Sequence, residues 1–414
     1  MNKIDIKKII IVVVVLALAY SIFFIFTNKK ETTQSIDSLG TFFPFSNEES
    51  PSSSTTKDEQ TNNNPYSYED ISVGSIPILR QITATPTSGM FIFEDNTKNN
   101  KELNDKNYFI RYIEKGTGHI YETDTNSSTQ TRISNTTIPK IQETIWLDKD
   151  SLVIRYLDED NIIKTFSASI VESELGDKQL EGVFLQDNIQ ALIGFKEGVF
   201  YLLESGQGSI GVTSDKNDEN KKIVFNSPLK EWLIKNVDNK YINFTTKPAI
   251  NVYGYSFLLN TETGSFNKII NGKYNLSTLT SNVFNILYSE YNKLGPKLYT
   301  YDNTEKISTE ILITTLPEKC IWDEENIYIY CGIPTIDLIN YDLTAWYKGI
   351  KLFSDDIWRI NTELNTLEFL ISPIDTGVGE IDIINPVLSK NDDYILFINK
   401  QDFSLWSLKL KKDL

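Results

Sequence analysis

The chain has 414 residues, of which 40% are hydrophobic and 12% are aromatic. This composition supports a large folded core and argues against a mostly disordered chain. The net charge of -16 opposes binding to nucleic acid, which requires a basic face. One histidine and two cysteines argue against a histidine-rich metal site, a zinc ribbon and a disulfide-dense small domain.

The N-terminal segment has the pattern of a membrane anchor. Residues 9–26 read IIIVVVVLALAYSIFFIF and carry no charge. A helix of that length covers roughly 27 Å, close to the bilayer core of about 30 Å. We therefore expect an uncleaved transmembrane signal anchor over residues 9–27. The alternative is a cleaved signal peptide: Ala17-Leu18-Ala19 fits a cleavage site, but cleavage there would leave an apolar stub on the mature chain.

The lysines around this segment and the sizes of its flanks predict its orientation. Three lysines lie within residues 1–8, and Lys29 and Lys30 follow the apolar run. The positive-inside bias therefore favours a cytoplasmic N-terminus narrowly. The size asymmetry points the same way, because only the short tail would stay inside. We expect a single-pass protein of the cell membrane, with residues 1–8 as a cytoplasmic tail and the C-terminal domain extracytoplasmic.

Residues 28–75 have the composition of a flexible linker. Their central stretch, NEESPSSSTTKDEQTNNNPYSYED (47–70), is rich in Ser, Thr, Asn and Pro and has no periodic apolar residue. Such a composition buries too little surface to offset the entropy lost on ordering. The folded domain is therefore expected over residues 76–414.

From residue 78 onward the sequence changes to short strands rich in β-branched and aromatic residues, with turn signals between them. Clear examples are MFIFE (90–94), SLVIRYL (151–157) and NIYIYC (326–331). Helix-length amphipathic windows with capping residues are absent from this part of the sequence. The pattern predicts an all-β domain.

A longer repeat overlies these strands. Its unit, clearest in residues 138–166, is a strand, a proline, a strand ending in tryptophan, an acidic turn, an apolar strand and a polar strand. Trp146, Trp232 and Trp322 are 86 and 90 residues apart. Each step is about two units of 43–45 residues, a length that suits a four-stranded propeller blade. Seven units are counted, and they begin near residues 86, 139, 188, 228, 274, 317 and 376.

The two ends of the domain predict how such a ring would close. RQITATP (80–86) resembles the outermost strands that lead into later blades, yet no blade precedes it. The last blade ends at Leu410 after its third strand. We expect residues 78–83 to supply the missing fourth strand, which would leave no long exposed edge. The predicted fold is a seven-bladed β-propeller with four-stranded blades.

Several phrases carry a resemblance to a known family. They are GTGHIYETD (116–124), RISNTTIPKI (132–141), RYLDEDNIIKTFSA (155–168), PEKCIWDEENIYIYC (317–331) and SLWSLKL (404–410). With the anchor, they resemble an uncharacterised group of membrane-anchored bacterial β-propellers of the WD40-like or TolB-like kind. The resemblance implies architecture and location and supplies no activity. The chain departs from true WD40 repeats, since it lacks a Gly-His…Trp-Asp signature in register.

Cys320 and Cys331 flank a predicted hairpin and would lie opposite or nearly opposite each other. In an exported domain two cysteines tend to pair, so a disulfide is expected. The alternatives are two buried thiols and a metal or redox role.

His119 follows a Gly-x-Gly turn and has Glu114, Glu122 and Asp124 near it in sequence. A catalytic role as general base would need a nucleophile and an orienting carboxylate. The alternative is a turn histidine that makes one local hydrogen bond.

Acidic clusters recur in the predicted turns. They are Asp158-Glu159-Asp160, Asp323-Glu324-Glu325, Asp355-Asp356, Asp392-Asp393 and the cluster of Asp215, Asn217, Asp218 and Glu219. Calcium favours six to eight oxygens around a glycine-kinked loop, a pattern absent here, whereas hairpin turns favour Asp and Asn in any case. The sequence also lacks a Gly-x-Ser-x-Gly elbow, a P-loop and a Rossmann fingerprint. It therefore predicts no catalytic, cofactor-binding or metal-binding residue, and it singles out no carboxylate pair for glycoside hydrolysis.

The least repetitive segment, residues 333–358, lengthens the sixth repeat by about 20 residues beyond a usual blade. It carries four aromatic residues that are candidate contacts for a protein partner: Trp346, Tyr347, Phe353 and Trp358. The alternative is a lid that packs onto its own blade.

Together these features favour a non-catalytic protein-interaction scaffold or recognition module of the cell envelope. The membrane, through residues 9–27, and an unknown envelope protein are the expected partners; nucleic acid and cofactors are not expected. The first alternative is an envelope hydrolase or lyase, which predicts ionisable side chains with perturbed pKa values converging at the propeller axis. The second is a glycan or solute sensor, which predicts an aromatic-lined pocket there. Arg111 and Arg155 would then face either the funnel or a blade face.

Overall fold

The computed structural model describes residues 77–94, 108–173, 176–196, 198–249, 251–292, 295–338 and 343–410. The tail expected over residues 1–8, the anchor over 9–27 and the linker over 28–75 lie outside the described residues. Among the residues that are described, no helix is long and apolar enough to cross a membrane.

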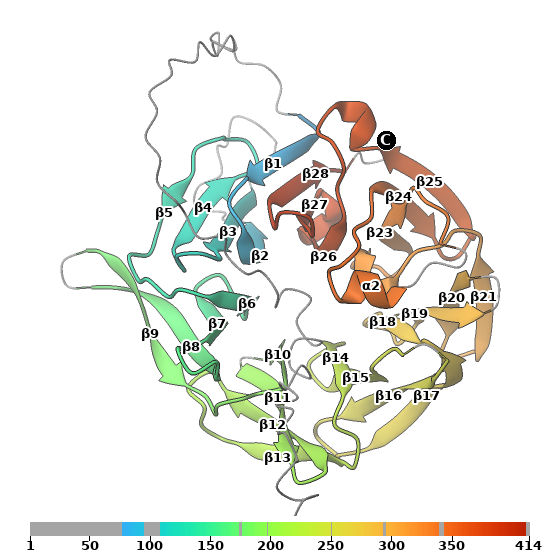
Figure 1. Ribbon diagram of the computed structural model, residues 1–414, viewed down its shortest axis with the longest axis horizontal. Helices are drawn as coiled ribbons and strands as arrows, with labels where there is room; N and C mark the ends of the chain where they lie inside the picture. Colours follow the sequence, from blue (N-terminus) through green and yellow to red (C-terminus); the bar gives the residue numbers. More distant parts are fainter. Residues whose placement is uncertain are drawn as a thin grey trace, which may run out of the picture. The chain divides into compact units, whose positions relative to one another are not determined.

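The described chain forms seven four-stranded antiparallel sheets arranged around a central axis, as Figure 1 shows. Blade one is β2 (Thr87–Glu94), β3 (Tyr108–Glu114), β4 (Ile120–Asp124) and β5 (Thr131–Arg132); blade two is β6 (Ile141–Trp146), β7 (Ser151–Leu157), β8 (Ile163–Glu172) and β9 (Lys178–Phe184). Blade three is β10 (Ala191–Phe195), β11 (Gly198–Ser205), β12 (Gly208–Asp215) and β13 (Lys222–Ser227); blade four is β14 (Trp232–Asn236), β15 (Tyr241–Thr246), β16 (Tyr253–Asn260) and β17 (Phe266–Tyr274).

The remaining blades complete the ring. Blade five is β18 (Ser277–Thr280), β19 (Ile286–Asn292), β20 (Gly295–Asp302) and β21 (Ile307–Ile311); blade six is β22 (Cys320–Trp322), β23 (Tyr328–Pro334), β24 (Asp355–Asn361) and β25 (Thr366–Ile371). Blade seven is β26 (Ile383–Leu388), β27 (Tyr394–Asn399), β28 (Leu405–Lys409) and β1 (Leu79–Thr83). The short helices are η1 (Pro317–Lys319), α2 (Leu343–Tyr347), η2 (Ile374–Thr376) and η3 (Lys390–Asp392). The predicted seven blades of four strands are confirmed.

The ring closes as predicted, through the first strand of the domain. β1 pairs antiparallel with β28, and Leu79 lies opposite Leu408. The N-terminal strand thus becomes the outermost strand of the last blade. This pairing leaves β28 without an open edge, which removes a site where another chain's strand would otherwise pair.

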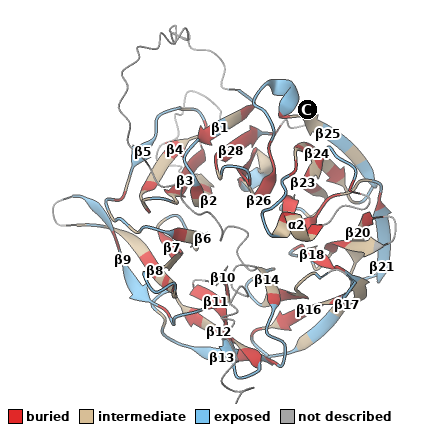
Figure 2. Cartoon of the chain, viewed as in Figure 1, coloured by how far each residue is buried: buried red, intermediate tan, exposed pale blue. Residues whose placement is uncertain are grey.

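The core lies between neighbouring blades, because the inner strands of each sheet are covered on both faces (Figure 2). Every residue of β27 is buried, whereas four of the five residues of β21, an outermost strand, are exposed. One hydrophobic cluster joins Val153 of blade two to Val199 and Tyr201 of blade three. Apolar residues on both faces of an inner strand therefore hold adjacent blades together.

The meander of each sheet gives the ring two distinct faces. Since neighbouring strands are antiparallel, the connections between first and second and between third and fourth strands open to one face, which we call the turn face. The second-to-third and blade-to-blade connections open to the other, which we call the crossover face. Hydrogen bonds that join connections of the crossover face include those from Ile138 N to Thr117 O (2.9 Å) and from Lys115 N to Pro86 O (2.7 Å).

Candidate functional site

The longest connection of the crossover face is the insertion of blade six. It lies between β23, which ends at Pro334, and β24, which begins at Asp355, and it carries α2 (Figure 1). Its bounds are narrower than the predicted 333–358, because Ile333 and Pro334 pair with Asp356 and Asp355 as strand residues. Trp358 accordingly lies within β24, opposite Cys331.

Two aromatic residues fix the insertion to the propeller. Trp346 is 3% exposed and Phe353 is 2% exposed, and their rings stack at 5.8 Å between centroids. The Trp346 indole donates a hydrogen bond to Asp382 Oδ2 (2.9 Å), and the Phe353 backbone N–H donates to the same oxygen (2.9 Å). The burial of these two residues favours packing of the segment onto its own blade. Partner contact through them remains a prediction.

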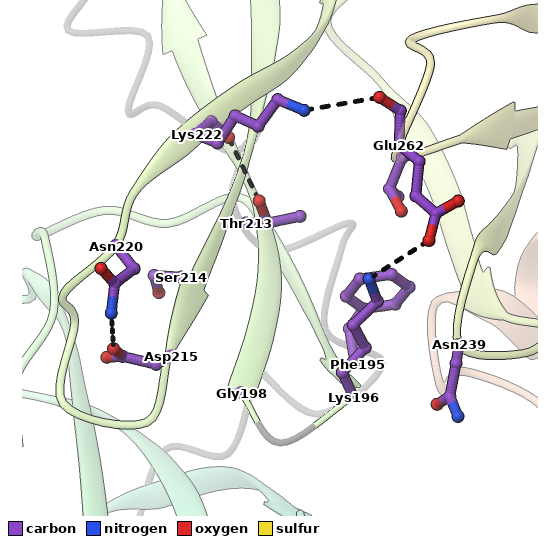
Figure 3. Close-up of a pocket in the computed structure, with 11 residues that line it drawn as sticks. Phe195, Lys196, Gly198, Thr213, Ser214, Asp215, Asn220, Lys222, Asn239 and Glu262 are labelled. Atoms are coloured by element: carbon purple, nitrogen blue, oxygen red, sulfur yellow. Dashed lines mark hydrogen bonds and ion pairs between the residues drawn. The ribbon is translucent and has the colours of Figure 1, made fainter.

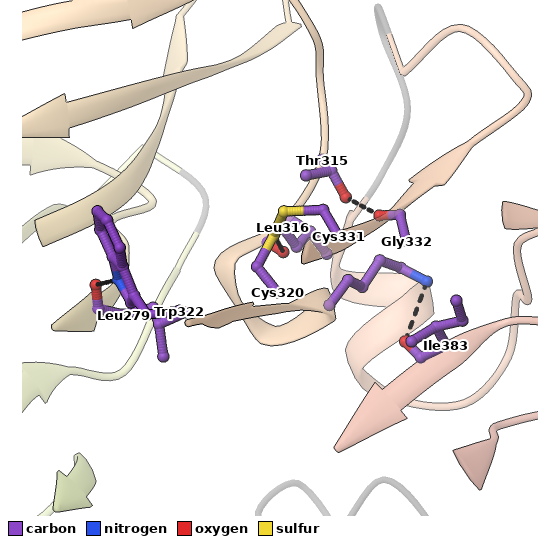
Figure 4. Close-up of a disulfide and its surroundings, with 9 residues drawn as sticks. Leu279, Thr315, Leu316, Cys320, Trp322, Cys331, Gly332 and Ile383 are labelled. Carbon is purple, nitrogen blue, oxygen red and sulfur yellow. Dashed lines mark hydrogen bonds between the residues drawn. A yellow bond between two sulfur atoms is a disulfide. The ribbon is translucent and has the colours of Figure 1, made fainter. Parts of the chain in front are cut away.

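Beneath these rings lies a buried cluster of charged groups, which we call the blade-six ion cluster: Lys319, Asp355, Asp382 and Lys400. The Lys319 ammonium group, with a side chain 0% exposed, donates to Asp355 Oδ2 (2.5 Å) and to Asp382 Oδ1. It also donates to the Ile383 carbonyl (3.4 Å; Figure 4). It stands 5.1 Å from the centroids of both the Trp346 and Phe353 rings. Burial of a charge is tolerated where such partners compensate the lost hydration.

Two members of the cluster have strongly perturbed pKa values. Burial lowers the pKa of Lys400 to about 7, with the Asp382 carboxylate opposing that change. Burial raises the pKa of Asp355 to about 6, and the Lys319 ammonium group opposes it. Lys400 is 4% exposed, donates to the Trp346 carbonyl and lies 3.6 Å from the centroid of the Trp346 ring.

The cluster spans blades six and seven in a way that requires a glycine. A Cβ on Gly332 would lie 2.9 Å from the Ile383 Cβ and 3.0 Å from Asp355 Oδ2. The Ile383 backbone N–H donates to that same carboxylate oxygen (2.7 Å). Gly332 therefore permits the close approach of β26 to the carboxylate at the start of β24.

A second polar group connects α2 to blade five. Glu318 Oε1, in η1, accepts hydrogen bonds from the Ser277 hydroxyl (2.7 Å) and the Tyr347 hydroxyl (2.9 Å). Desolvation raises the pKa of Tyr347 well above its ordinary value, and the Glu318 carboxylate adds to the shift. Among the described residues, Glu318 Oε2 has no hydrogen-bond partner. The insertion is thus held to blades five, six and seven together.

The structure joins Cys320 and Cys331 in a disulfide, with an S–S distance of 2.10 Å (Figure 4). The two residues are direct partners in the β22–β23 ladder. Both are buried, and Cys320 directly follows Lys319 of the ion cluster. The cross-link therefore lies beside the base of the insertion. In the part of the chain that is described, no group of three or more His, Cys, Asp or Glu residues is arranged to hold a metal ion.

The other residues singled out from the sequence are dispersed. The His119 ring Nε2 lies 3.2 Å from the Thr137 hydroxyl, while Glu122 pairs with Arg111 (2.8 Å). Acidic turn residues accept hydrogen bonds from backbone N–H groups of their own turns. Asp323 Oδ1, for example, accepts a hydrogen bond from the Tyr328 N–H (2.9 Å). Of the acidic clusters, only Asp355 joins the ion cluster.

Arg111 and Arg155 lie on blade faces and connect neighbouring blades. Arg111, in blade one, pairs with Asp150 of blade two (2.7 Å). Arg155, in blade two, pairs with Glu143 of the same blade (2.6 Å) and donates to the Ile189 carbonyl ahead of blade three. Both guanidinium groups therefore help to hold neighbouring blades of the ring together.

Beyond its buried base the insertion exposes apolar side chains. Ile350 is 73% exposed, and Ile336 and Leu352 are 44% and 43% exposed. Lys348 and Lys351 alternate with Ile350 and Leu352 and are exposed too. The loop 348–352 therefore presents an apolar and basic surface on the crossover face.

The turn face carries a separate feature, a cleft of about 690 Å³ between blades three and four (Figure 3). Its lining comes from turns of both blades and includes Lys196, Lys222, Asn239 and Glu262. It lies between two blades, away from the insertion, and its lining combines polar side chains with the ring of Phe195. The aromatic-lined pocket expected for a solute sensor at the axis has no counterpart in this cleft.

Among solved structures, the chain is similar to TolB-like and other β-propellers. TolB from Acinetobacter baumannii is 8% identical, with 74% of this chain and 77% of that chain covered and a TM-score of 0.38. The β-propeller domain of the trilobed protease from Pyrococcus furiosus is 11% identical, with 75% and 94% covered and a TM-score of 0.47. An oligogalacturonate lyase in complex with manganese is 9% identical, with 73% and 74% covered and a TM-score of 0.35. No protein-family profile and no curated protein sequence matches the chain.

Proposed function

We propose that the chain is a non-catalytic interaction scaffold of the cell envelope, and that the loop 348–352 of the blade-six insertion is its contact surface for a protein partner. One observation carries the proposal: Ile350 is 73% exposed on a loop whose neighbours Trp346 and Phe353 are almost fully buried. Exposed apolar side chains that are grouped on one firmly anchored loop, here Ile350 and Leu352, are characteristic of a recognition surface.

The anchoring lowers the entropy cost of recognition. Three hydrogen bonds to the Asp382 carboxylate and one from Lys400 to the Trp346 carbonyl hold the two flanks of the loop. A loop that is ordered before binding loses less conformational freedom when the partner arrives. Its lysines favour a partner whose apolar docking surface has an acidic rim.

The wider crossover face supports the same role. Other connections on this face also expose large apolar side chains, among them Leu229, Val252, Leu312 and Ile374. A partner surface that covers this face would bury these side chains as well.

The proposed location follows from the sequence. An anchor over residues 9–27 and a linker over 28–75 would hold the propeller outside the cytoplasm, near the membrane. A protease added to intact cells should then remove the propeller and leave a short protected N-terminal fragment. Protection of the whole chain in intact cells, with digestion only after lysis, would contradict this orientation.

The alternative of an envelope hydrolase or lyase has one observation in its favour, the perturbed pKa values of Lys400 and Asp355. Such shifts are common at catalytic sites, but buried structural ion networks produce them too. Each charged side chain of the ion cluster is at most 4% exposed. A catalytic group must touch its substrate, so this burial favours the scaffold.

The test is in-cell crosslinking of the full chain followed by affinity capture, comparing the unchanged protein with Ile350→Asp combined with Leu352→Asp. The matched control is Leu364→Asp, because Leu364 is 71% exposed in the same blade but on the turn face. We expect a partner that is retained by the control and lost with the double variant. An identical set of crosslinked proteins for all three forms would overturn the assignment of this loop.

A further inference from the structure

The cleft between blades three and four is built from turns that lie far apart in the sequence. The β10–β11 turn supplies Lys196, the β12–β13 connection supplies Asp215 and leads to Lys222, and the β16–β17 turn supplies Glu262 (Figure 3). All these turns open to the turn face. The cleft is therefore on the side opposite the blade-six insertion, and the proposed scaffold role does not use it.

Lys196 has a backbone that its residue type rarely adopts. Its φ of 55° lies in the left-handed region, which costs energy for a residue with a side chain unless the surroundings hold it. In that conformation its ammonium group stands 5.3 Å from the centroid of the Phe195 ring, which is itself buried. The turn thus directs a cation into the cleft.

Three lysines lie around Glu262, two of them near its carboxylate and one near its backbone carbonyl. Lys196 Nζ lies 4.0 Å from Glu262 Oε1, and Lys240 Nζ lies 3.6 Å from Oε2. Lys222 Nζ reaches only the Glu262 carbonyl oxygen, at 3.5 Å. Charge-assisted hydrogen bonds are normally about 2.7–2.9 Å long. Among the described residues, the contacts of these three ammonium groups with oxygen are therefore all long.

Asp215, the other carboxylate among the described lining residues, accepts hydrogen bonds from groups of its own turn. Asp215 Oδ1 accepts from the backbone N–H groups of Asn217 (3.0 Å) and Glu219 (2.8 Å), and Oδ2 accepts from the Asn220 amide (2.7 Å). The bond from Glu219 is the main cause of a lowered Asp215 pKa. The described part of the cleft therefore holds lysine donors without close acceptors, in a chain whose net charge is -16.

We infer that this cleft binds an oxyanion, a carboxylate or phosphate group carried by a small polar ligand. Lys196 and Lys222, which line the cleft, would supply the positive charge, together with Lys240, which contacts the lining residue Glu262. The amide of Asn239 would supply a further hydrogen bond. The volume of about 690 Å³ accommodates a ligand of small-molecule size around that group. Glu262 competes with the ligand, because its carboxylate lies within 4.0 Å of the Lys196 and Lys240 ammonium groups.

The experiment titrates the full chain by calorimetry at low salt with inorganic phosphate, with citrate and with glucose. Phosphate and citrate separate the two sources of the oxyanion, and glucose tests recognition of hydroxyl groups alone. Lys222→Gln and Lys196→Asn remove one charge each, and asparagine tolerates the left-handed backbone of position 196. Lys297→Gln is the control, since Lys297 pairs with Glu310 (2.6 Å) in blade five.

We expect saturable binding of at least one of the two anions, weakened about threefold to fivefold by either cleft variant and unchanged by the control. Glu262→Gln should tighten binding, because it removes the carboxylate that lies near Lys196 and Lys240. Weaker anion binding in Glu262→Gln, equal binding of glucose, or no saturable binding of phosphate or citrate would each overturn the inference. Thermal unfolding of each variant shows whether it is folded, so a failure to fold is distinguishable from a loss of binding.

Discussion

The Trp346 indole nitrogen donates to Asp382 Oδ2 at 2.9 Å, and this contact joins the insertion of blade six to the residue that precedes the first strand of blade seven. Asp382 also receives the Lys319 ammonium group and the Phe353 backbone N–H. A single buried carboxylate therefore fixes the insertion, the base of blade six and the start of blade seven relative to one another. Loss of its charge should affect all three.

We expect Asp382→Asn to destabilise the protein by about 3–5 kcal/mol, because it leaves the buried Lys319 ammonium group with one carboxylate fewer and Lys400 without its main counter-charge. Urea unfolding followed by intrinsic fluorescence measures the change in the free energy of unfolding. Asp375→Asn is the matched control, since Asp375 is an exposed residue of η2. Equal stability of Asp382→Asn and the control would show that the ion cluster contributes little.

Lys400 should make stability depend on pH in the alkaline range. Burial lowers its pKa to about 7, whereas an unfolded chain keeps a lysine pKa of about 10.4. Between these values the unfolded state binds a proton that the folded state does not, so the free energy of unfolding rises with pH through this group. Asp355 titrates below this range, because burial raises its pKa only to about 6.

Denaturant unfolding from about pH 7 to about pH 10 therefore should show a smaller upward slope for Lys400→Met than for the unchanged chain. Lys348→Met, at an exposed position of the same insertion, should keep the original slope. A slope in Lys400→Met identical to that of the unchanged chain would mean that Lys400 stays charged in the folded protein.

The blade architecture could be predicted because it repeats. β-branched and aromatic residues mark each strand, and the spacing of Trp146, Trp232 and Trp322 marks pairs of blades. The closing strand could be predicted too, since the segment around Leu79 resembles outer strands elsewhere and the last blade lacks one. These are local patterns that need no knowledge of the curvature of the ring.

The ion cluster could not be predicted from the same patterns. Lys319 belongs to a repeated phrase, and Asp355 belongs to a predicted acidic turn. Asp382 and Lys400 lie beyond blade six in the sequence. Only the packing of blade six against blade seven brings these groups together. The predicted bounds of the insertion, 333–358, were too wide. β23 ends at Pro334 and β24 begins at Asp355, so residues that break the repeat pattern still pair as strands.

The cleft of the turn face left no signal in the sequence either. Lys196 and Glu262 are in turns of different blades, and neither turn has an unusual composition. The packing of blade three against blade four places Lys196 Nζ 4.0 Å from Glu262 Oε1. This cleft forms between two repeats, whereas the sequence patterns describe the strands within one repeat.

The disulfide gives a prediction that is independent of the insertion. Cys320 and Cys331 close a short loop, with a sequence separation of 11 residues. A cross-link of that span should stabilise the fold by about 2–3 kcal/mol at most, since the entropy gained by cutting it grows only slowly with loop length. Cys320→Ala with Cys331→Ala should lower the melting temperature, and a reducing agent should then have no further effect. A shift caused by the reducing agent in the double variant would show that it acts elsewhere.

The closing strand should be essential for the whole propeller. Leu79 is 5% exposed and contributes to the hydrophobic cluster of blade seven, whereas its neighbour Ile78 is 45% exposed. Leu79→Asp would bury an unpaired carboxylate against that cluster, so we expect a loss of at least about 3 kcal/mol and an exposed edge on β28. Ile78→Asp is the matched control and should change stability by less than about 0.5 kcal/mol. Urea unfolding compares the two variants, and size-exclusion chromatography reports association through the freed edge. Similar stability of both variants would mean that the six remaining blades and three strands of the seventh hold the ring without β1.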